Sequence, residues 1–193
     1  KNMQKNYDYI LKSIEEIKKI TLNLEDYIPF VKELADYIYE FRNQTNFIYV
    51  IGNGGSFSDS DHLCGELLGR FEKERIGLPI NSLGSLATIT SIANDYGYEN
   101  IYSKQLETLL KPEDLLIVFS TSGKSKNILN AVKLAIKKNC RVYAMTGYSG
   151  LEIKNKLITE CRINSKRTCR IQEIHGILIH LICEIIDNKL LID

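Results

Sequence analysis

The sequence lacks both an excess of charge of one sign and a long hydrophobic run. It has 25 Lys and Arg residues against 24 Asp and Glu residues, so no overall field would gather nucleic acid or an anionic membrane surface. No stretch approaches the ~18 apolar residues of a membrane-spanning helix. We therefore expect no nucleic-acid partner and no membrane partner, and any anion would have to be held by a local site.

Cysteine pairs are also missing. The five cysteines are scattered and none forms a CxxC pair, which argues against a disulfide framework and against a cysteine zinc site. Residues 1–16 contain no apolar core of a signal peptide. We expect a cytoplasmic protein. With 44% hydrophobic and 25% charged residues in 193, the composition is typical of one globular domain, which we place at residues 1–193.

Residues 1–44 carry two helical patterns on either side of Pro29. Neither helix could bury its apolar stripe alone, so each needs the rest of the chain, a second subunit, or both. The stripes consist of Ile10, Leu11, Ile14, Ile17 and Ile20, and of Phe30, Leu34, Ile38 and Phe41.

Residues 45–193 instead show short apolar runs, each followed by a turn and a helical stretch. This alternation predicts an α/β fold with a central parallel sheet, in which helices such as Ser125–Lys137 connect the strands. A last helix, about residues 171–186, carries Ile and Leu on most of its circumference and should be largely buried. The runs lie at residues 47–51, 115–119 and 142–145, with weaker candidates at 78–82 and 161–163.

Two loops of small polar residues follow predicted strands, at Gly52–Ser56 and Ser120–Ser125. Open α/β sheets bind their ligands at the carboxyl ends of the strands, where glycine permits close approach and the next helix offers free N–H groups to an anion. The alternative is that these residues only form turns and helix caps. Neither loop matches a nucleotide-binding signature, which disfavours nucleotide binding.

His62 and Glu66 are four residues apart in a predicted helix, so they share one face. This spacing suits a metal-ligand pair or an acid/base pair, but by itself it more often marks only a partly exposed helix face. The segment Asn94–Gly97 could form a turn, or its Asn94 and Asp95 side chains could reach sugar hydroxyls.

Gln172 and His180 are about two turns apart in the last helix and share a side. His180 lies among apolar neighbours, so its ring needs a partner or a task, although a satisfied core histidine is the alternative. His175 points elsewhere and is interpreted as a packing or capping residue.

Together these segments resemble the phosphoheptose isomerase family, and the resemblance covers nearly the whole chain. It implies a SIS-type three-layer α/β/α sandwich, a homotetramer with active sites at subunit interfaces, and a bound divalent metal, typically zinc. The matching segments are Gly52–Ser56 with Asp59, His62 and Glu66, then Leu68–Phe71, Glu74-Arg75, Ala93–Gly97, Ser120–Ser125, and Arg170–Glu173 with His175 and His180.

The resemblance also implies roles for individual residues. Glu66 and His180 match the catalytic acid/base pair. The phosphate would be held by Ser56, Ser120, Thr121, Ser122 and Ser125, and the sugar contacted by Asn53, Gly54, Asn94 and Asp95, with Gly55, Glu66 and Gln172 completing the substrate-binding set. The metal ligands would be His62, Glu66, Gln172 and His180.

The reaction implied is the interconversion of D-sedoheptulose 7-phosphate and D-glycero-D-manno-heptose 7-phosphate through an enediol, the first step toward nucleotide-activated heptose for surface polysaccharide. One alternative is a non-catalytic SIS adaptor that binds the replication initiator DnaA, against which the retained Glu66 and His180 argue. Another is a SIS isomerase of a different sugar phosphate, because Ser85 and Ala87 stand where the family usually has Asp and Ser.

Overall fold

The computed structural model describes residues 2–43 and 45–191 and contains a five-stranded parallel sheet of order β2-β1-β3-β4-β5. All five sequence-predicted strands are confirmed. The weaker two are shifted, and the last begins earlier than expected. The strands are β1 (Ile48–Ile51), β2 (Ile80–Ser82), β3 (Leu115–Ser120), β4 (Arg141–Thr146) and β5 (Ile158–Arg162).

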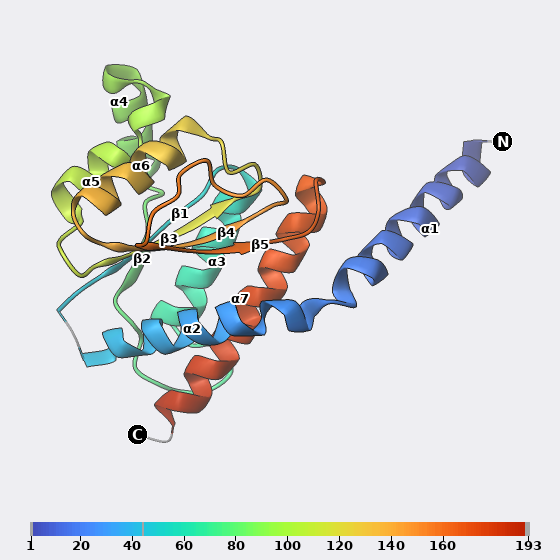
Figure 1. Ribbon diagram of the computed structural model, residues 1–193, viewed down its shortest axis with the longest axis horizontal. Helices are drawn as coiled ribbons and strands as arrows, with labels where there is room; N and C mark the ends of the chain where they lie inside the picture. Colours follow the sequence, from blue (N-terminus) through green and yellow to red (C-terminus); the bar gives the residue numbers. More distant parts are fainter. Residues whose placement is uncertain (1, 44, 192–193) are drawn as a thin grey trace.

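Helices cover both faces of this sheet, which gives the three-layer α/β/α arrangement that the sequence predicts. Helices α5 and α6 lie on one face, and α2, α3 and α7 on the other (Figure 1). The helices are α1 (Asn2–Thr21), α2 (Ile28–Tyr39), α3 (Gly55–Leu68), α4 (Leu86–Tyr96), α5 (Ser103–Leu109), α6 (Lys126–Lys137) and α7 (Thr168–Leu190), with 3-10 turns at Leu24–Tyr27, Glu40–Asn43 and Tyr98–Asn100.

The central strand β3 shows how the two cores are built. Its side chains point alternately to the two faces of the sheet, as in any strand. Leu115, Ile117 and Phe119 enter the core beneath α2, α3 and α7. Leu116 and Val118 enter the core beneath α5 and α6. Because both faces are covered, β3 is apolar from Leu115 to Phe119, which is why its run was visible in the sequence.

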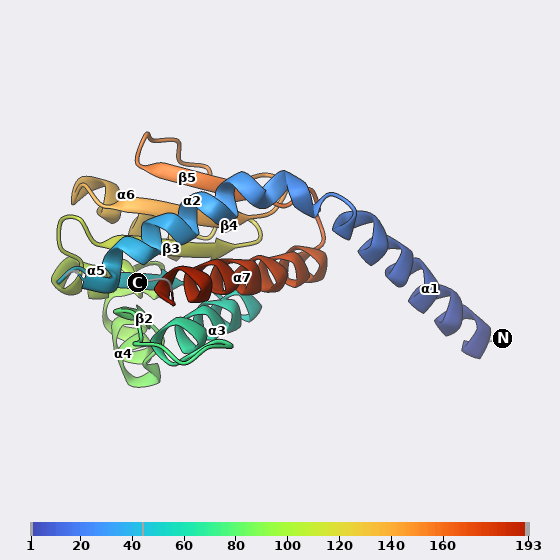
Figure 2. The ribbon, with the colours of Figure 1, turned by 90° about the horizontal axis from the view of Figure 1, so that it is seen from below.

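Helix α1 extends away from the rest of the chain (Figures 1 and 2). It is tied to the start of α7, where Arg170 Nη1 donates to the carbonyl of Ser13 at 3.2 Å and Arg167 pairs with Glu16. Its apolar stripe is mostly exposed, with Ile10 at 58% and Ile14 at 41% of full exposure. The second predicted helix, α2, is buried along its stripe, so the two N-terminal helices differ in what covers them.

Helix α7 is longer than predicted and less buried than predicted. One side of α7 packs on α2, α3 and the sheet, through residues such as Ile174, Leu178 and Ile182. The other side is half-buried or exposed, because nothing among the described residues covers it. Within residues 2–43 and 45–191, no helix is both long and apolar enough to cross a membrane.

Candidate active site

The two polar loops come together because β1 and β3 are neighbours in the sheet, with Ile51 aligned to Val118. From β1 the chain crosses through α3 on one face to reach β2. From β3 it crosses through α6 on the other face to reach β4. The strand order therefore reverses between β1 and β3, and the carboxyl edge at such a reversal is where open α/β sheets form a ligand crevice.

The first loop turns sharply into α3. Gly54, the residue before the helix, has φ +57°, a left-handed conformation that glycine adopts without steric cost. Its carbonyl accepts the N–H groups of Phe57 at 2.9 Å and Ser58 at 3.1 Å. Ser56 lies in the first turn of α3 and is 3% exposed. The start of α3, the positive end of its helix dipole, thus lies at the crevice.

The second loop presents hydroxyls whose oxygens already accept hydrogen bonds. Ser120 Oγ accepts the N–H of Gly123, and Ser122 Oγ accepts the N–H of Lys124, both at 3.2 Å. Each hydroxyl still has its proton to donate. Ser125 is the N-cap residue of α6 but makes no side-chain capping bond, which leaves its hydroxyl for a ligand. The Lys124 side chain is exposed.

Between the loops lies a small cavity of about 40 Å³, which all five predicted phosphate-binding residues line. Beneath it, Asn53 and Asn127 exchange two amide hydrogen bonds of 2.8 and 3.0 Å. Tyr98 also donates to Asn53 Oδ1, at 3.2 Å. Asn53 is therefore held by two partners. The cavity is lined by Asn53, Ser56, Phe119, Ser120, Thr121, Ser122 and Ser125.

The second part of the site is a cluster of His62, Glu66 and His180. His62 Nε2 lies 3.3 Å from Glu66 Oε1 and 3.1 Å from His180 Nε2. One ligand atom from each of the three lies within 4.8 Å of the others, so the three residues could hold a metal ion. The pairing of His62 with Glu66 agrees with the helical spacing. The expectation of an apolar environment for His180 was wrong, because its ring is exposed beside His62 and Phe71.

Gln172 lies apart from this cluster, two turns earlier along α7. Its Nε2 donates to Ser56 Oγ at 3.4 Å, and a Cβ on Gly55 would meet the same amide at 2.6 Å. Helices α3 and α7 therefore run in parallel, with Ser56 beside Gln172 and His62 beside His180. The cavity therefore lies at the start of this helix pair, and the cluster lies about two turns further along it.

A buried pair, Asp59 and His175, lies on the inner side of the same helices. His175 is fully buried against Phe119, which agrees with the packing role expected for it. Its Nδ1 is 3.9 Å from Asp59 Oδ2. Burial lowers the pKa of His175 to about 4 and raises the pKa of Asp59 to about 6, because a charge without solvent is disfavoured on either group. His175 is therefore neutral at neutral pH, whereas Asp59 takes up a proton as the pH falls below about 6.

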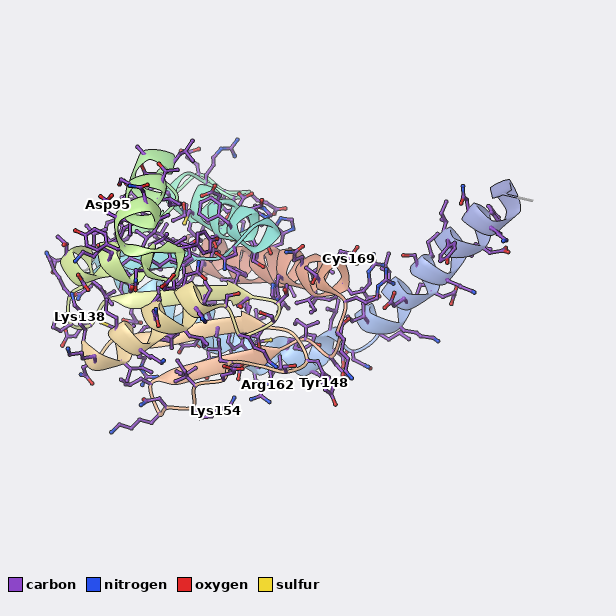
Figure 3. All side chains as sticks on the ribbon, turned by 90° about the horizontal axis from the view of Figure 1, so that it is seen from above. Asp95, Lys138, Tyr148, Lys154, Arg162 and Cys169 are labelled. Carbon is purple, nitrogen blue, oxygen red and sulfur yellow. The ribbon has the colours of Figure 1, made fainter. Side chains whose placement is uncertain are left out.

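Asn94 and Asp95 do not form the turn that was one expectation. They lie in the last turn of α4, which contains no buried residue, and Asn94 Nδ2 donates to Asp95 Oδ1 at 2.8 Å. Asp95 lies on the outer part of the chain (Figure 3). The turn begins only at Gly97, which has φ +87°. Neither residue lines the cavity, so the sequence-based sugar contact stays a prediction.

Three residues of the site region had no role in the sequence-based prediction. Asn127 is 2% exposed and holds Asn53, but an Asn at a helix start has no distinctive pattern. Tyr98 reaches Asn53 from beyond α4. Arg75 donates to the carbonyl of Glu66 at 2.7 Å. Arg75 belongs to a segment that matches the family, but its ion-pair partner Asp187 is distant in sequence.

Comparisons of the sequence and of the fold with known proteins lead to the same family. Residues 8–147 match the model of the SIS domain family. The phosphoheptose isomerase of Colwellia psychrerythraea is 44% identical over 149 residues, covering 75% of this chain and 76% of the relative. That of Coxiella burnetii is 40% identical over 181 residues, covering 92% and 91%. The solved phosphoheptose isomerase of Francisella tularensis superposes with a TM-score of 0.89 at 34% identity, covering 95% of this chain and 98% of that one.

Proposed function

Because this chain belongs to the phosphoheptose isomerase family of SIS domains, we propose that it interconverts D-sedoheptulose 7-phosphate and D-glycero-D-manno-heptose 7-phosphate. The observation that carries the proposal is the pairing of a hydroxyl-lined cavity with the cluster His62, Glu66 and His180 further along the same two helices. A seven-carbon sugar phosphate has its phosphate and its reacting carbons at opposite ends, which suits two binding levels. The product would supply nucleotide-activated heptose for surface polysaccharide.

At the cavity, the phosphate would be bound by neutral donors. The Ser120 and Ser122 hydroxyls have protons free to donate, and α3 and α6 begin at the cavity, so that their first N–H groups favour an anion. Asn53, Gly54 and Gly55 would contact the sugar, with Asn94 and Asp95 approaching from α4. Gln172, which already contacts Ser56, would link the phosphate to the sugar end.

At the cluster, Glu66 would move the proton between C1 and C2, and His180 would transfer protons at the two oxygens, through an enediol. The ketose loses its C1 proton to the Glu66 carboxylate, and the same carboxyl returns a proton to C2. His180 first gives a proton to the C2 oxygen, which forms the enediol, and then takes the proton of the C1 hydroxyl, so the catalyst is restored and the atoms balance. The retained pair also argues against a non-catalytic adaptor.

The cluster also fits a zinc ion, because two imidazoles and a carboxylate converge there and zinc takes such ligands. His62, Glu66 and His180 would hold it, with Gln172 as the fourth ligand implied by the family. When bound, zinc would polarise the sugar oxygens. A carboxylate that binds zinc is a weaker base, so we propose that Glu66 alternates between a metal-holding and a substrate-ready arrangement.

The exposed apolar surface supports a homotetramer with sites at subunit interfaces. The stripe of α1 is exposed at Ile10 and Ile14. A second apolar groove, lined in part by Ile28, Val31 and Ile185, runs between α2 and α7. We also propose that residues 1–193 act as one domain in the cytoplasm, where all five cysteines would remain free thiols.

The direct test is incubation of the purified protein with sedoheptulose 7-phosphate, followed by detection of the aldose by NMR. Parallel incubations with five- and six-carbon ketose phosphates would measure the substrate preference. A His180→Gln preparation, purified in the same way, controls for contaminating isomerases. Absence of aldose from the seven-carbon substrate, with turnover of a shorter one, would exclude the proposed reaction while preserving the isomerase class.

A further inference from the structure

A buried ion pair joins the loop after α3 to α7. Arg75 Nε lies 2.7 Å from Asp187 Oδ1, and the two side chains are 3% and 2% exposed. The other oxygen, Asp187 Oδ2, accepts the main-chain N–H groups of Glu72 and Lys73, both at 3.0 Å. Burial alone would raise the pKa of Asp187, but these bonds from Arg75 and the main chain hold it below its usual value. The carboxylate is therefore charged at neutral pH.

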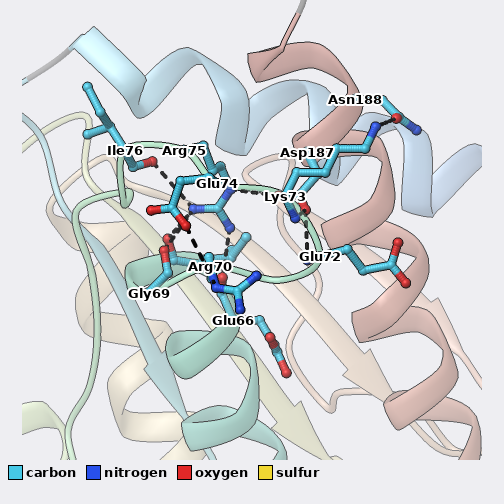
Figure 4. Close-up of polar contacts among 11 residues, drawn as sticks. Glu66, Gly69, Arg70, Glu72, Lys73, Glu74, Arg75, Ile76, Asp187 and Asn188 are labelled. Atoms are coloured by element: carbon cyan, nitrogen blue, oxygen red, sulfur yellow. Dashed lines mark hydrogen bonds and ion pairs between the residues drawn. The ribbon is translucent and has the colours of Figure 1, made fainter.

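The guanidinium of Arg75 also caps the end of α3 (Figure 4). Its Nη2 donates to the carbonyl of Glu66 at 2.7 Å, and its Nη1 to the carbonyl of Leu67 at 3.0 Å, with a longer contact of 3.3 Å to that of Gly69. The last carbonyls of a helix have no partner within the helix. A fork of several donors can hold them at fixed positions, which an ammonium group does not do as well.

Arg75 and Asp187 each lie near a residue of the catalytic cluster. Asp187 is seven residues after His180 in α7, so the two lie on the same side of the helix, about 10 Å apart along its axis. On α3, the carbonyl that Arg75 holds belongs to Glu66 itself. The ion pair thus joins α3 to α7 next to the cluster, and the displacement of α3 along α7 decides whether His62 and Glu66 lie opposite His180.

We propose that Arg75 and Asp187 are positioning residues of the isomerase, which fix the axial alignment of α3 against α7 and thereby the His62–Glu66–His180 geometry. The expected effect on turnover rests on the function proposed above. The expected effect on the alignment of the two helices does not depend on it. Neither residue lines the phosphate cavity, so their effect falls on the reacting end of the substrate and spares phosphate binding.

The test compares Asp187→Asn with a matched control, Asp114→Asn. Asp114 is also a buried carboxylate, 1% exposed, and accepts two main-chain N–H groups, from Phe47 at 2.8 Å and Lys111 at 2.7 Å. It precedes β3, at the sheet edge opposite the site. Both variants are expected to lower the melting temperature. Only Asp187→Asn is expected to lower kcat, by about 10- to 100-fold, because small misplacements of reacting groups are costly, while KM stays within about twofold.

A second readout is independent of activity. The chain has three histidines, so selective ¹³C labelling of histidine gives one imidazole signal from each. In Asp187→Asn the signals of His62 and His180 are expected to move, whereas the buried His175 signal serves as an internal reference. Asp114→Asn should leave all three in place. If the wild-type protein proves inactive, the proposed function fails, and these signals still decide whether the ion pair aligns the helices.

If Asp187→Asn does not fold, Asp187→Glu replaces it, because it keeps the charge and lengthens the arm by one carbon. The proposal is overturned if the signals of His62 and His180 stay unmoved in a folded variant. It is also overturned if kcat falls only as far as in Asp114→Asn, because the pair would then contribute stability alone.

Discussion

His62 on α3 and His180 on α7 face each other with their Nε2 atoms 3.1 Å apart. At this distance one nitrogen must donate and the other accept, since two protonated nitrogens would repel. The alternative is a metal ion that both nitrogens bind. Glu66, 3.3 Å from His62, provides a negative charge for either arrangement. The contact therefore makes this corner of the chain suited to proton transfer and to metal binding.

Removing either acid/base group should stop turnover. We expect Glu66→Gln and His180→Gln each to lower kcat by ~10²–10⁴-fold, the usual contribution of a general acid or base, with the melting temperature little changed because both side chains are at least partly exposed. Steady-state assays with sedoheptulose 7-phosphate measure this. A near-normal rate in either variant would remove that residue from the mechanism.

Zinc binding should depend on the cluster. Isothermal titration of the metal-free protein with zinc is expected to give one ion per subunit. His62→Asn should weaken zinc binding by about 10- to 100-fold or more, because loss of a residue that only hydrogen-bonds a metal ligand already costs that much. Gln172→Ala separates two roles. A similar loss of affinity would make Gln172 a ligand, whereas an unchanged affinity would leave it as a partner of Ser56 alone.

Phosphate binding should depend on hydroxyls more than on the nearby lysine. Replacing Ser120 or Ser122 with Ala removes a donor to a charged group, worth ~1.5–3 kcal/mol, so KM should rise by roughly 10- to 100-fold. Lys124→Ala should cost much less, because that side chain is exposed. If Lys124→Ala proves the most damaging of the three, the phosphate is held by direct charge pairing.

The buried His175 should make the protein less stable in acid. Its pKa is lowered to about 4 in the fold, against ~6.5 in the unfolded chain. Between these values the unfolded chain binds more protons, so stability is complete above pH ~6.5 and falls by up to about 3 kcal/mol as the pH decreases toward 4. Melting curves of His175→Gln and wild type should therefore converge as the pH is lowered from neutral.

Asp59 should change the stability of the fold with pH in the opposite direction to His175. Burial raises its pKa from 3.8 to about 6, so its contribution is complete below pH 3.8 and is lost as the pH rises through 6. Asp59→Asn should gain stability relative to wild type above pH 6 and show no such gain near pH 4. Parallel shifts of both variants at every pH would show that neither group titrates as proposed.

The N-terminal helix should be required for assembly. Light scattering at micromolar concentration is expected to give a tetramer, whereas Ile10→Ser with Ile14→Ser should give a smaller species, because these two side chains carry much of the exposed stripe of α1. Lys12→Ser, which changes an exposed polar residue on the same helix, is the matched control. A monomeric wild type would contradict the assembly itself.

The strands and loops could be predicted because their signals are local. A buried parallel strand such as β3 is apolar over five consecutive residues, Leu115 to Phe119, and a Gly- and Ser-rich loop follows at once. The exposure of His180 could not be predicted in this way. Helical spacing shows which residues share a face, but it does not show whether another element covers that face.

The partnership of Arg75 with Asp187 was hidden for a related reason. Arg75 ends a run of alternating charges, Glu72 to Arg75, which is typical of a solvated loop. Its burial depends on Asp187 of α7, which comes 112 positions later. Asn127 was equally hidden, since only the adjacency of β1 and β3 brings it to Asn53.

That adjacency has a consequence for folding. The two loops of the phosphate cavity follow strands that are far apart in the chain and pair in parallel, and such non-local pairing forms slowly, because a long loop must close before any contact is gained. The cavity therefore cannot exist before the centre of the sheet does. An anion that binds between the loops would select molecules in which this slow step is complete, and would raise the apparent stability of the whole fold with the logarithm of its concentration once that exceeds the dissociation constant.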